Sequence, residues 1–277
     1  MSIYRKISKI QGWFSFVDYS MFKNIIEFQN SIGQTSQLCE IGVHHGKSFI
    51  PMVHFSGDSV CHCIDIFEEQ SLNFDSSGKG DLNIFYKNLK KFKLSKDRVR
   101  VHKKLSTLMT KENLCRIGES IRFFHIDGGH NLEVVKSDIN LGLKCSDRYS
   151  VIAIDDVCRS EWIEVSKGVF ESSLLLREYG FVALAFGFNK LYLCHESMLD
   201  DYREALNRDV ILNTFLEKIY KVKGTSSSQI PIYSTMPLPE WSIARFAIHF
   251  IKLKFPFLYF KTIGSSLKFC FKIAKKF

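Results

Sequence analysis

The chain has 277 residues, of which 45% are hydrophobic and 24% charged, and only five are prolines. This composition excludes a disordered or collagen-like chain and predicts a globular protein with a sizeable core. The formal net charge is +9, but residues 241–277 contain eight Lys and Arg and no acid, so residues 1–240 carry only +1. This uneven distribution argues against binding of the whole chain to nucleic acid.

The cysteines and the N-terminus indicate a cytoplasmic protein. The eight cysteines are scattered through apolar segments without a Cys-x-x-Cys pair, which predicts free thiols in a reducing compartment. The N-terminal segment is a poor signal peptide because Gln11, Gly12 and Ser15 interrupt its apolar stretch. No uncharged apolar run approaches the roughly 20 residues that are needed to cross a bilayer.

In chain order, helical and strand patterns alternate. Helices are predicted over residues 21–30, 48–55, 81–93, 132–143 and 161–179, and strands over residues 37–43, 60–67, 98–105, 121–127 and 149–157. Strands that are apolar throughout and alternate with helices predict a parallel sheet covered on both faces. Two further strands, 181–187 and 191–195, are joined so closely that they must form an antiparallel hairpin. We therefore expect an α/β fold: a Rossmann-like, doubly wound, mostly parallel sheet that ends in an antiparallel hairpin, with a helical C-terminal extension.

The pattern divides the chain into five parts. These are a helical segment over residues 1–35, the α/β domain over 36–197, a helix over 198–223, a linker rich in Gly, Ser and Pro over 224–240, and a tail over 241–277.

The tail has the pattern of a basic amphipathic extension. Phe246 and Phe250 recur at helical spacing opposite Arg245 and Lys252, and the pattern repeats after Pro256. Such a segment fits the plane of an anionic membrane surface. The alternative is that its apolar face packs on the core or on a second subunit of a homo-oligomer. RNA is disfavoured, because no nucleic-acid motif accompanies the charge.

The end of the first strand has the sequence of a ligand-binding loop. In an open parallel sheet, ligands bind at the carboxyl ends of the strands. Gly42 and Gly46 permit a tight turn there, and the following helix offers free N–H groups. Such a loop suits the carboxylate of an amino-acid-like ligand whose ammonium group Glu40 can hold, although many βα turns need two glycines for geometry alone. Asp65, at the end of the second strand, is placed to accept both hydroxyls of a ribose, or is an ordinary acid at a strand end.

The fourth and fifth strands also end in acids. Asp127 opens the sequence Asp-Gly-Gly-His130, and Asp155 and Asp156 follow the fifth strand. Three neighbouring carboxylates would repel each other and raise their pKa values unless a cation offset them. Oxygen ligands of this kind suit a hard ion such as Mg²⁺. The alternative for Asp155 or Asp156 is to cap the next helix.

Together these motifs resemble the class I S-adenosylmethionine-dependent methyltransferases over about residues 36–195. The motifs are Glu-Ile-Gly-x-x-x-Gly-x-Ser, the acid after the second strand, Ile-Asp-Gly-x-His with the downstream Asp138, and Ile-Asp-Asp. Within that fold the chain is similar to macrolide-sugar O-methyltransferases, such as the macrocin and mycinamicin enzymes, and to related proteins of bacterial glycan biosynthesis. The resemblance implies that S-adenosylmethionine is bound by Glu40, Gly42, Gly46, Ser48, Asp65 and Asp127, and that Mg²⁺ or another divalent cation is bound by Asp127, Asp155 and Asp156.

The resemblance also implies how the reaction proceeds. In the sugar enzymes the metal binds neighbouring hydroxyls of the acceptor, and a cation both orients a hydroxyl and makes its proton easier to lose. Asp127 and His130 are the catalytic candidates, with His130 as general base, as a residue that orients a ligand, or as a ligand itself. His44 and His45 either face solvent or touch substrate, and Trp162 either packs in the core or stacks on a sugar ring.

We therefore expect an Mg²⁺-dependent O-methyltransferase that acts on a sugar hydroxyl of a bacterial glycan or glycolipid. The tail would hold it at the inner face of the cytoplasmic membrane. Two alternatives remain: a non-catalytic protein that binds ligand or membrane on the same fold, and an RNA-modifying methyltransferase.

Overall fold

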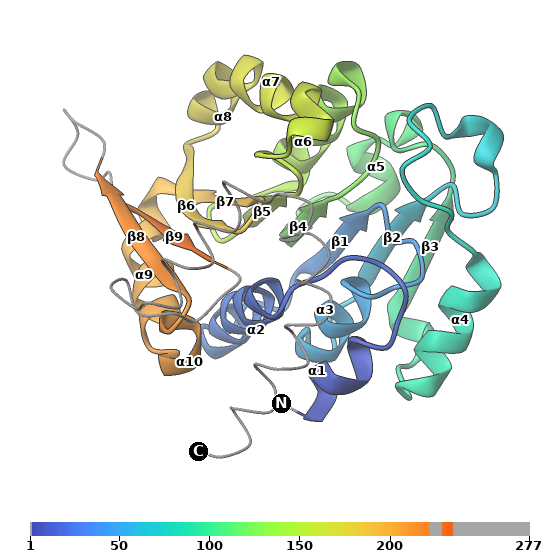
Figure 1. The fold of residues 1–277 in the computed structure, drawn as a ribbon, viewed down its shortest axis with the longest axis horizontal. Coiled ribbons are helices and arrows are strands. Elements are labelled where there is room, and N and C mark those ends of the chain that lie inside the picture. Colours follow the sequence, from blue (N-terminus) through green and yellow to red (C-terminus); the bar gives the residue numbers. More distant parts are fainter. Residues whose placement is uncertain (1, 222–228, 235–277) are drawn as a thin grey trace, which may run out of the picture. The chain divides into compact units, whose positions relative to one another are not determined.

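The computed structural model describes residues 2–221 and 229–234, which form an α/β structure around a nine-stranded sheet (Figure 1). The strands are β1 (Gln37–Ile41), β2 (Cys61–Asp65), β3 (Val99–Lys103), β4 (Ile121–Ile126), β5 (Val151–Ile154), β6 (Phe181–Gly187), β7 (Lys190–His195), β8 (Leu216–Lys221) and β9 (Gln229–Tyr233). Their order is β3-β2-β1-β4-β5-β7-β6-β9-β8. β1 to β5 are parallel, and β7 lies antiparallel between β5 and β6. The predicted fold and its antiparallel hairpin are confirmed, whereas the predicted tail lies outside the described residues.

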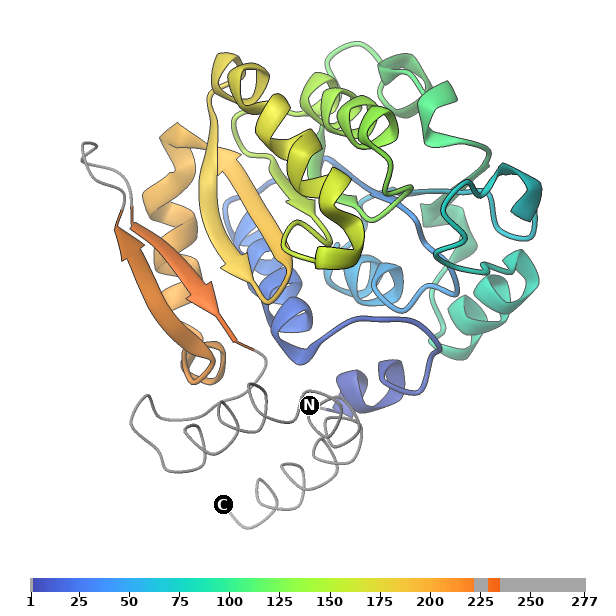
Figure 2. The same ribbon diagram turned by 45° about the horizontal axis from the view of Figure 1, so that its top comes forward.

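Helices cover both faces of the sheet, each over its own apolar core. They are α1 (Ser2–Ile7), α2 (Phe16–Ser31), α3 (Phe49–Phe55), α4 (Leu82–Lys91), α5 (Lys111–Leu114), α6 (Leu132–Cys145), α7 (Ile163–Glu171), α8 (Ser173–Glu178), α9 (Leu199–Asn207) and α10 (Val210–Asn213). One core includes side chains of α2, α3 and α9, and the other includes side chains of α6, α7 and α8. Figure 2 shows α6 and α7 on the side of the sheet opposite α2 and α3.

The register of the central strands places two polar side chains on an apolar face. Glu40 pairs with His125 across β1 and β4, and His125 pairs with Ala153 of β5. Because side chains alternate along a strand, Glu40 and His125 share the face that packs on α2, where Phe22 contacts the His125 ring. Buried polar groups require partners, and these two side chains contact each other, with Glu40 Oε1 and His125 Nδ1 2.9 Å apart.

The chain after the hairpin differs from the prediction. The helix expected over residues 198–223 is wrong, because α9 ends at Asn207 and the Asp209 side chain then caps the short α10. β8 follows, and it pairs with β9, which lies inside the predicted linker. Helical spacing of apolar residues is a local signal, whereas β8 is stabilised by a partner strand further along the chain.

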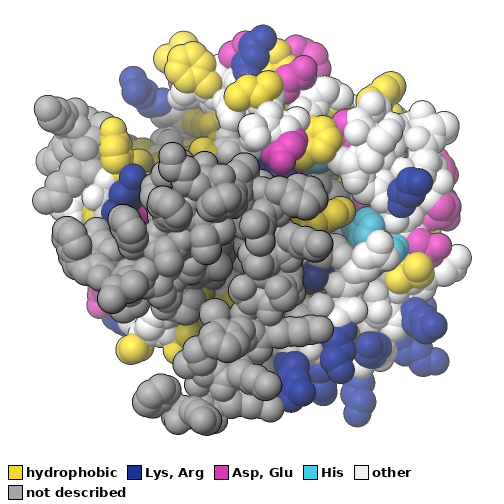
Figure 3. Space-filling view, in the orientation of Figure 1, with side chains coloured by type: hydrophobic (Ala, Val, Ile, Leu, Met, Phe, Trp, Pro, Cys, Tyr) yellow, Lys and Arg dark blue, Asp and Glu magenta, His cyan; other side chains and the backbone are white. Residues whose placement is uncertain are grey.

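The described residues include seven cysteines, all of which are free thiols, and six of these are buried. None of the helices within residues 2–221 combines the length and apolar character needed to cross a bilayer. Lys and Arg side chains gather around α4, whose last turn carries Lys90 and Lys91 (Figure 3).

Candidate active site

The turn after β1 passes directly against the end of β4. Gly42 and Gly46 have positive φ angles of 82° and 85°, a conformation that favours glycine. A Cβ atom on Gly42 would lie 1.6 Å from the carbonyl oxygen of Asp127, so no other residue fits there. The Asp127 N–H donates to the carbonyl oxygen of Ile41 at 2.9 Å, which fixes the two strand ends together.

Glu40 lies buried beneath this turn. Its Oε1 accepts hydrogen bonds from Ser48 Oγ and from His125 Nδ1, the latter at 2.9 Å. Its Oε2 is buried and has no hydrogen-bond partner among the described residues. Burial raises the pKa of Glu40 to about 8. Ser48, which we predicted as a cofactor residue, thus acts on Glu40 in this structure.

Asp65 joins the turn to β2. Its Oδ2 accepts from the N–H of His44 at 2.7 Å, and its Oδ1 accepts from the N–H of Phe67 at 2.5 Å. Burial raises its pKa. The rings of His44 and His45 contact each other, with their centres 3.9 Å apart and their planes tilted at 42°. A carboxylate oxygen accepts more than one hydrogen bond, so Asp65 retains capacity for a ligand.

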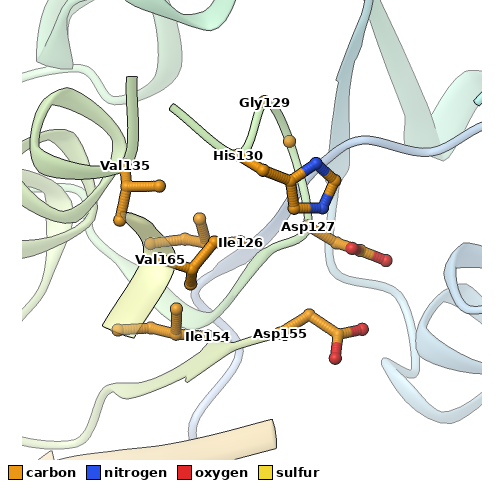
Figure 4. Close-up of a pocket in the computed structure, with 9 residues that line it drawn as sticks. Ile126, Asp127, Gly129, His130, Val135, Ile154, Asp155 and Val165 are labelled. Atoms are coloured by element: carbon orange, nitrogen blue, oxygen red, sulfur yellow. The ribbon is translucent and has the colours of Figure 1, made fainter. Parts of the chain in front are cut away.

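The predicted acids meet at the ends of β4 and β5. Figure 4 shows Asp127, Asp155 and His130 around a pocket whose apolar wall includes Val135 and Val165. Burial, together with repulsion from Asp155, raises the pKa of Asp127 well above its usual value. No hydrogen-bond partner for its carboxylate is found in the part of the chain that the structure describes.

His130 is held between two carboxylates. Its Nδ1 lies 2.8 Å from Asp75 Oδ2, and its Nε2 lies 3.2 Å from Asp156 Oδ2. Burial lowers its pKa, but these two partners outweigh it and raise the pKa to about 9. The ring also stacks on Trp162, with centres 4.2 Å apart and planes at 16°. A general base needs an unprotonated nitrogen, so this arrangement favours an orienting role for His130.

The turn between β6 and β7 supplies two residues that we did not predict. Asn189 Nδ2 donates to Asp156 Oδ1 at 2.6 Å, and its carbonyl oxygen accepts from the N–H of Val157 at 2.9 Å. Lys190 Nζ donates to Asp155 Oδ2 and to His125 Nε2, the latter at 2.9 Å. Each residue of the Asp155-Asp156 pair is therefore held by a neighbouring residue of one turn.

Lys190 is a buried cation. Burial alone would lower its pKa, but Asp155, Asp18 and Asp127 outweigh this and hold the pKa above its usual value. The sequence gives no signal for this, since Lys in a short hairpin turn is most often exposed. What buries it is the insertion of β7 beside β5, which places the start of β7 next to Asp155.

The acids fit a divalent cation in one of two groups. In His125, Asp127 and Asp155 one ligand atom of each lies within 4.8 Å of the others, and the same holds for Asp127, His130 and Asp156. Lys190 already contacts His125 and Asp155 of the first group. Asp127 belongs to both groups, and in the second group His130 and Asp156 already contact each other. The predicted set of Asp127, Asp155 and Asp156 is thus brought to one place, but Asp155 is paired with Lys190.

Comparison with known proteins agrees with this geometry. Residues 39–157 match the family model described as "Methyltransferase domain". Among solved structures, the O-methyltransferase NovP is 12% identical with a TM-score of 0.51, covering 64% of this chain and 80% of that one, which shows a shared fold. The calicheamicin methyltransferase CalS11 is 13% identical, with a TM-score of 0.48 and coverage of 65% and 79%. An O-methyltransferase from Bacillus cereus, in complex with SAH, is 18% identical, with a TM-score of 0.49 and coverage of 69% and 86%.

No curated protein matches the chain. The predicted resemblance to class I methyltransferases is nevertheless confirmed, and the family match supports methyl transfer as the reaction.

Proposed function

We propose that the protein is an O-methyltransferase that transfers the methyl group of S-adenosylmethionine to a sugar hydroxyl of a bacterial glycan or glycolipid. The observation that carries this proposal is a juxtaposition at one edge of the sheet. There the Gly42 turn, with the buried Glu40, lies directly against Asp127 and the other acids. A cofactor site beside carboxylates suits transfer to a hydroxyl, because a carboxylate can accept the hydroxyl proton.

The turn after β1 is the proposed site for the methionine part of the cofactor. Glu40 Oε2 is buried without a partner, so it is available to accept a hydrogen bond from the cofactor's ammonium group. Asp65 is the proposed partner of the ribose. The sulfonium group already activates the methyl group for transfer, so the protein mainly aligns the attack and removes a proton.

The acids are the proposed acceptor site. Asp127 and Asp156, the latter oriented by His130, would hold a divalent cation such as Mg²⁺, which supplies positive charge that orients a hydroxyl and lowers its pKa. Asp127 is our candidate for accepting the hydroxyl proton, because its carboxylate lines the pocket and has no hydrogen-bond partner among the described residues. Trp162, which is half-buried beside His130, offers an aromatic edge for a sugar ring.

The experiment that tests this function is methyl transfer from labelled S-adenosylmethionine to a panel of nucleotide-linked and lipid-linked sugars. We expect transfer that stops in chelator and resumes with Mg²⁺, while the affinity for the cofactor changes little. If calorimetry detects no binding of S-adenosylmethionine, the enzymatic function is wrong. If transfer continues unchanged in chelator, the role of the metal is wrong.

We also propose that residues 241–277 bring the enzyme to an anionic membrane surface. The support comes from the sequence, because this segment carries eight Lys and Arg and no acid. The full chain should float with phosphatidylglycerol vesicles, whereas a chain ending at Pro239 should not. Equal partitioning of the two proteins would contradict this proposal.

A further inference from the structure

Four polar side chains form a buried chain of hydrogen bonds between the acids and the cofactor turn. It begins at Lys190, which is 1% exposed and contacts His125 Nε2 at 2.9 Å. His125 is fully buried, and its Nδ1 lies 2.9 Å from Glu40 Oε1, which also accepts from Ser48 Oγ. These residues come from β7, β4, β1 and the residue before α3, so the chain crosses one face of the sheet.

The lysine determines the direction of every hydrogen bond in this chain. An ammonium group only donates, so His125 Nε2 must accept and the ring proton must lie on Nδ1. His125 therefore donates to Glu40 Oε1, where Ser48 Oγ donates as well. With two donors on Oε1, the carboxyl group of Glu40 is fixed in rotation, and Oε2 is the oxygen left for a ligand.

We propose that Lys190 is a positioning residue for the cofactor: through His125 it orients Glu40 toward the cofactor's ammonium group. This inference rests on the proposed function, because Glu40 is the proposed partner of that ammonium group. Lys190 also holds Asp155 on the acceptor side, so one buried cation orders both halves of the site. The simpler alternative is that Lys190 only balances the charge of Asp155 and has no effect on the cofactor.

These two interpretations predict different cofactor affinities when the ammonium group of Lys190 is removed. Without Lys190, His125 Nε2 loses its donor, and a proton on Nε2, which lies 4.0 Å from Asp155 Oδ2, is no longer excluded. The lone pair of Nδ1 would then face Oε1 of Glu40, which would turn the carboxyl group away. The affinity for the cofactor would therefore fall, although Lys190 lies at the acceptor end of this series of hydrogen bonds.

The test compares Lys190→Met with a matched control, Lys136→Met, which removes an exposed lysine paired with Glu171. Binding of S-adenosylhomocysteine is measured by calorimetry, and the His125 tautomer by ¹⁵N NMR of the imidazole ring. For Lys190→Met we expect roughly tenfold weaker binding, as for loss of a hydrogen bond to a charged group, and a His125 signal that is no longer of the pure Nδ1–H form. Lys136→Met should match the wild type in both measurements.

A double variant separates positioning from stability. Lys190→Met alone leaves Asp155 buried without its counterion, which can unfold the protein. Lys190→Met with Asp155→Asn removes that charge, so thermal stability should recover while the affinity and the tautomer remain altered. Recovery of wild-type affinity in the double variant, or an unchanged tautomer and affinity in Lys190→Met, would overturn the proposal. Failure of the wild type to bind S-adenosylhomocysteine would instead overturn the proposed function, and this inference with it.

Discussion

The raised pKa of Glu40 predicts that cofactor binding depends on pH. With a pKa of about 8, Glu40 is mostly protonated and neutral at pH 7 in the free protein. An ammonium group at Oε2 favours the ionised form, so binding must release the proton. Affinity should therefore rise with pH as long as Glu40 is protonated in the free protein and the cofactor's ammonium group remains charged.

The size of the effect follows from the pKa. If only the ionised form of Glu40 binds the cofactor, the observed Kd equals the Kd of that form divided by the ionised fraction of Glu40. Between pH 6 and pH 7 this predicts that Kd falls about ninefold, with release of about nine-tenths of a proton at pH 7. The α-amino group of the ligand loses its own proton at higher pH, so affinity should pass through a maximum once Glu40 is ionised and then decline.

Calorimetry with S-adenosylhomocysteine measures both quantities. Titrations in two buffers with different ionisation enthalpies give the number of protons released, and a series from pH 6 to pH 9 gives the profile. Glu40→Gln is the control, because it keeps the shape of the side chain and removes the titrating group. Its Kd should be flat between pH 6 and pH 7. A flat wild-type profile, or a ninefold change that persists in Glu40→Gln, would refute the reasoning.

Three further predictions concern the turn and the acceptor site. Gly42→Ala should lower the free energy of unfolding by more than about 4 kcal/mol, since its Cβ would collide with the Asp127 carbonyl, whereas Gly57→Ala, with a similar φ and open space, should cost about 1–2 kcal/mol in denaturant titrations. Asp127→Asn should reduce kcat at least about 100-fold in the transfer assay while S-adenosylhomocysteine still binds; retention of activity would exclude it as the base. Trp162→Ala should raise KM for the acceptor and leave cofactor affinity unchanged, and weaker cofactor binding would contradict its placement.

The residues at the strand ends were predictable, because an apolar strand marks its own carboxyl end. Asp65, Asp127 and Asp155 each follow such a run, and parallel strands bring these ends to one edge of the sheet. The glycine turn was predictable for the same reason. Neither prediction needed a contact between segments far apart in the chain, only the alternation of strands and helices.

Asn189 and Lys190 were not predictable by this reasoning. Their short turn was recognised, but its position beside Asp155 and Asp156 depends on β7 lying between β5 and β6. β8 was missed for a related reason, because its partner β9 lies in a segment with the composition of a linker. In both cases the decisive information is which strands become neighbours, and residue spacing within one segment does not contain it.

Three neighbouring aspartates require positive charge, as predicted, but part of that charge comes from side chains of the protein itself. The described residues supply cations of their own: Lys190 pairs with Asp155, and His130 and Arg159 pair with Asp156. The Asp127 carboxylate has no hydrogen-bond partner among the described residues, and burial, together with repulsion from Asp155, raises its pKa. Asp127 is therefore the carboxylate of the cluster that is left for a ligand, in the pocket beside the Gly42 turn. This is where a hydroxyl proton must be accepted if the methyl group arrives from the cofactor on the other side.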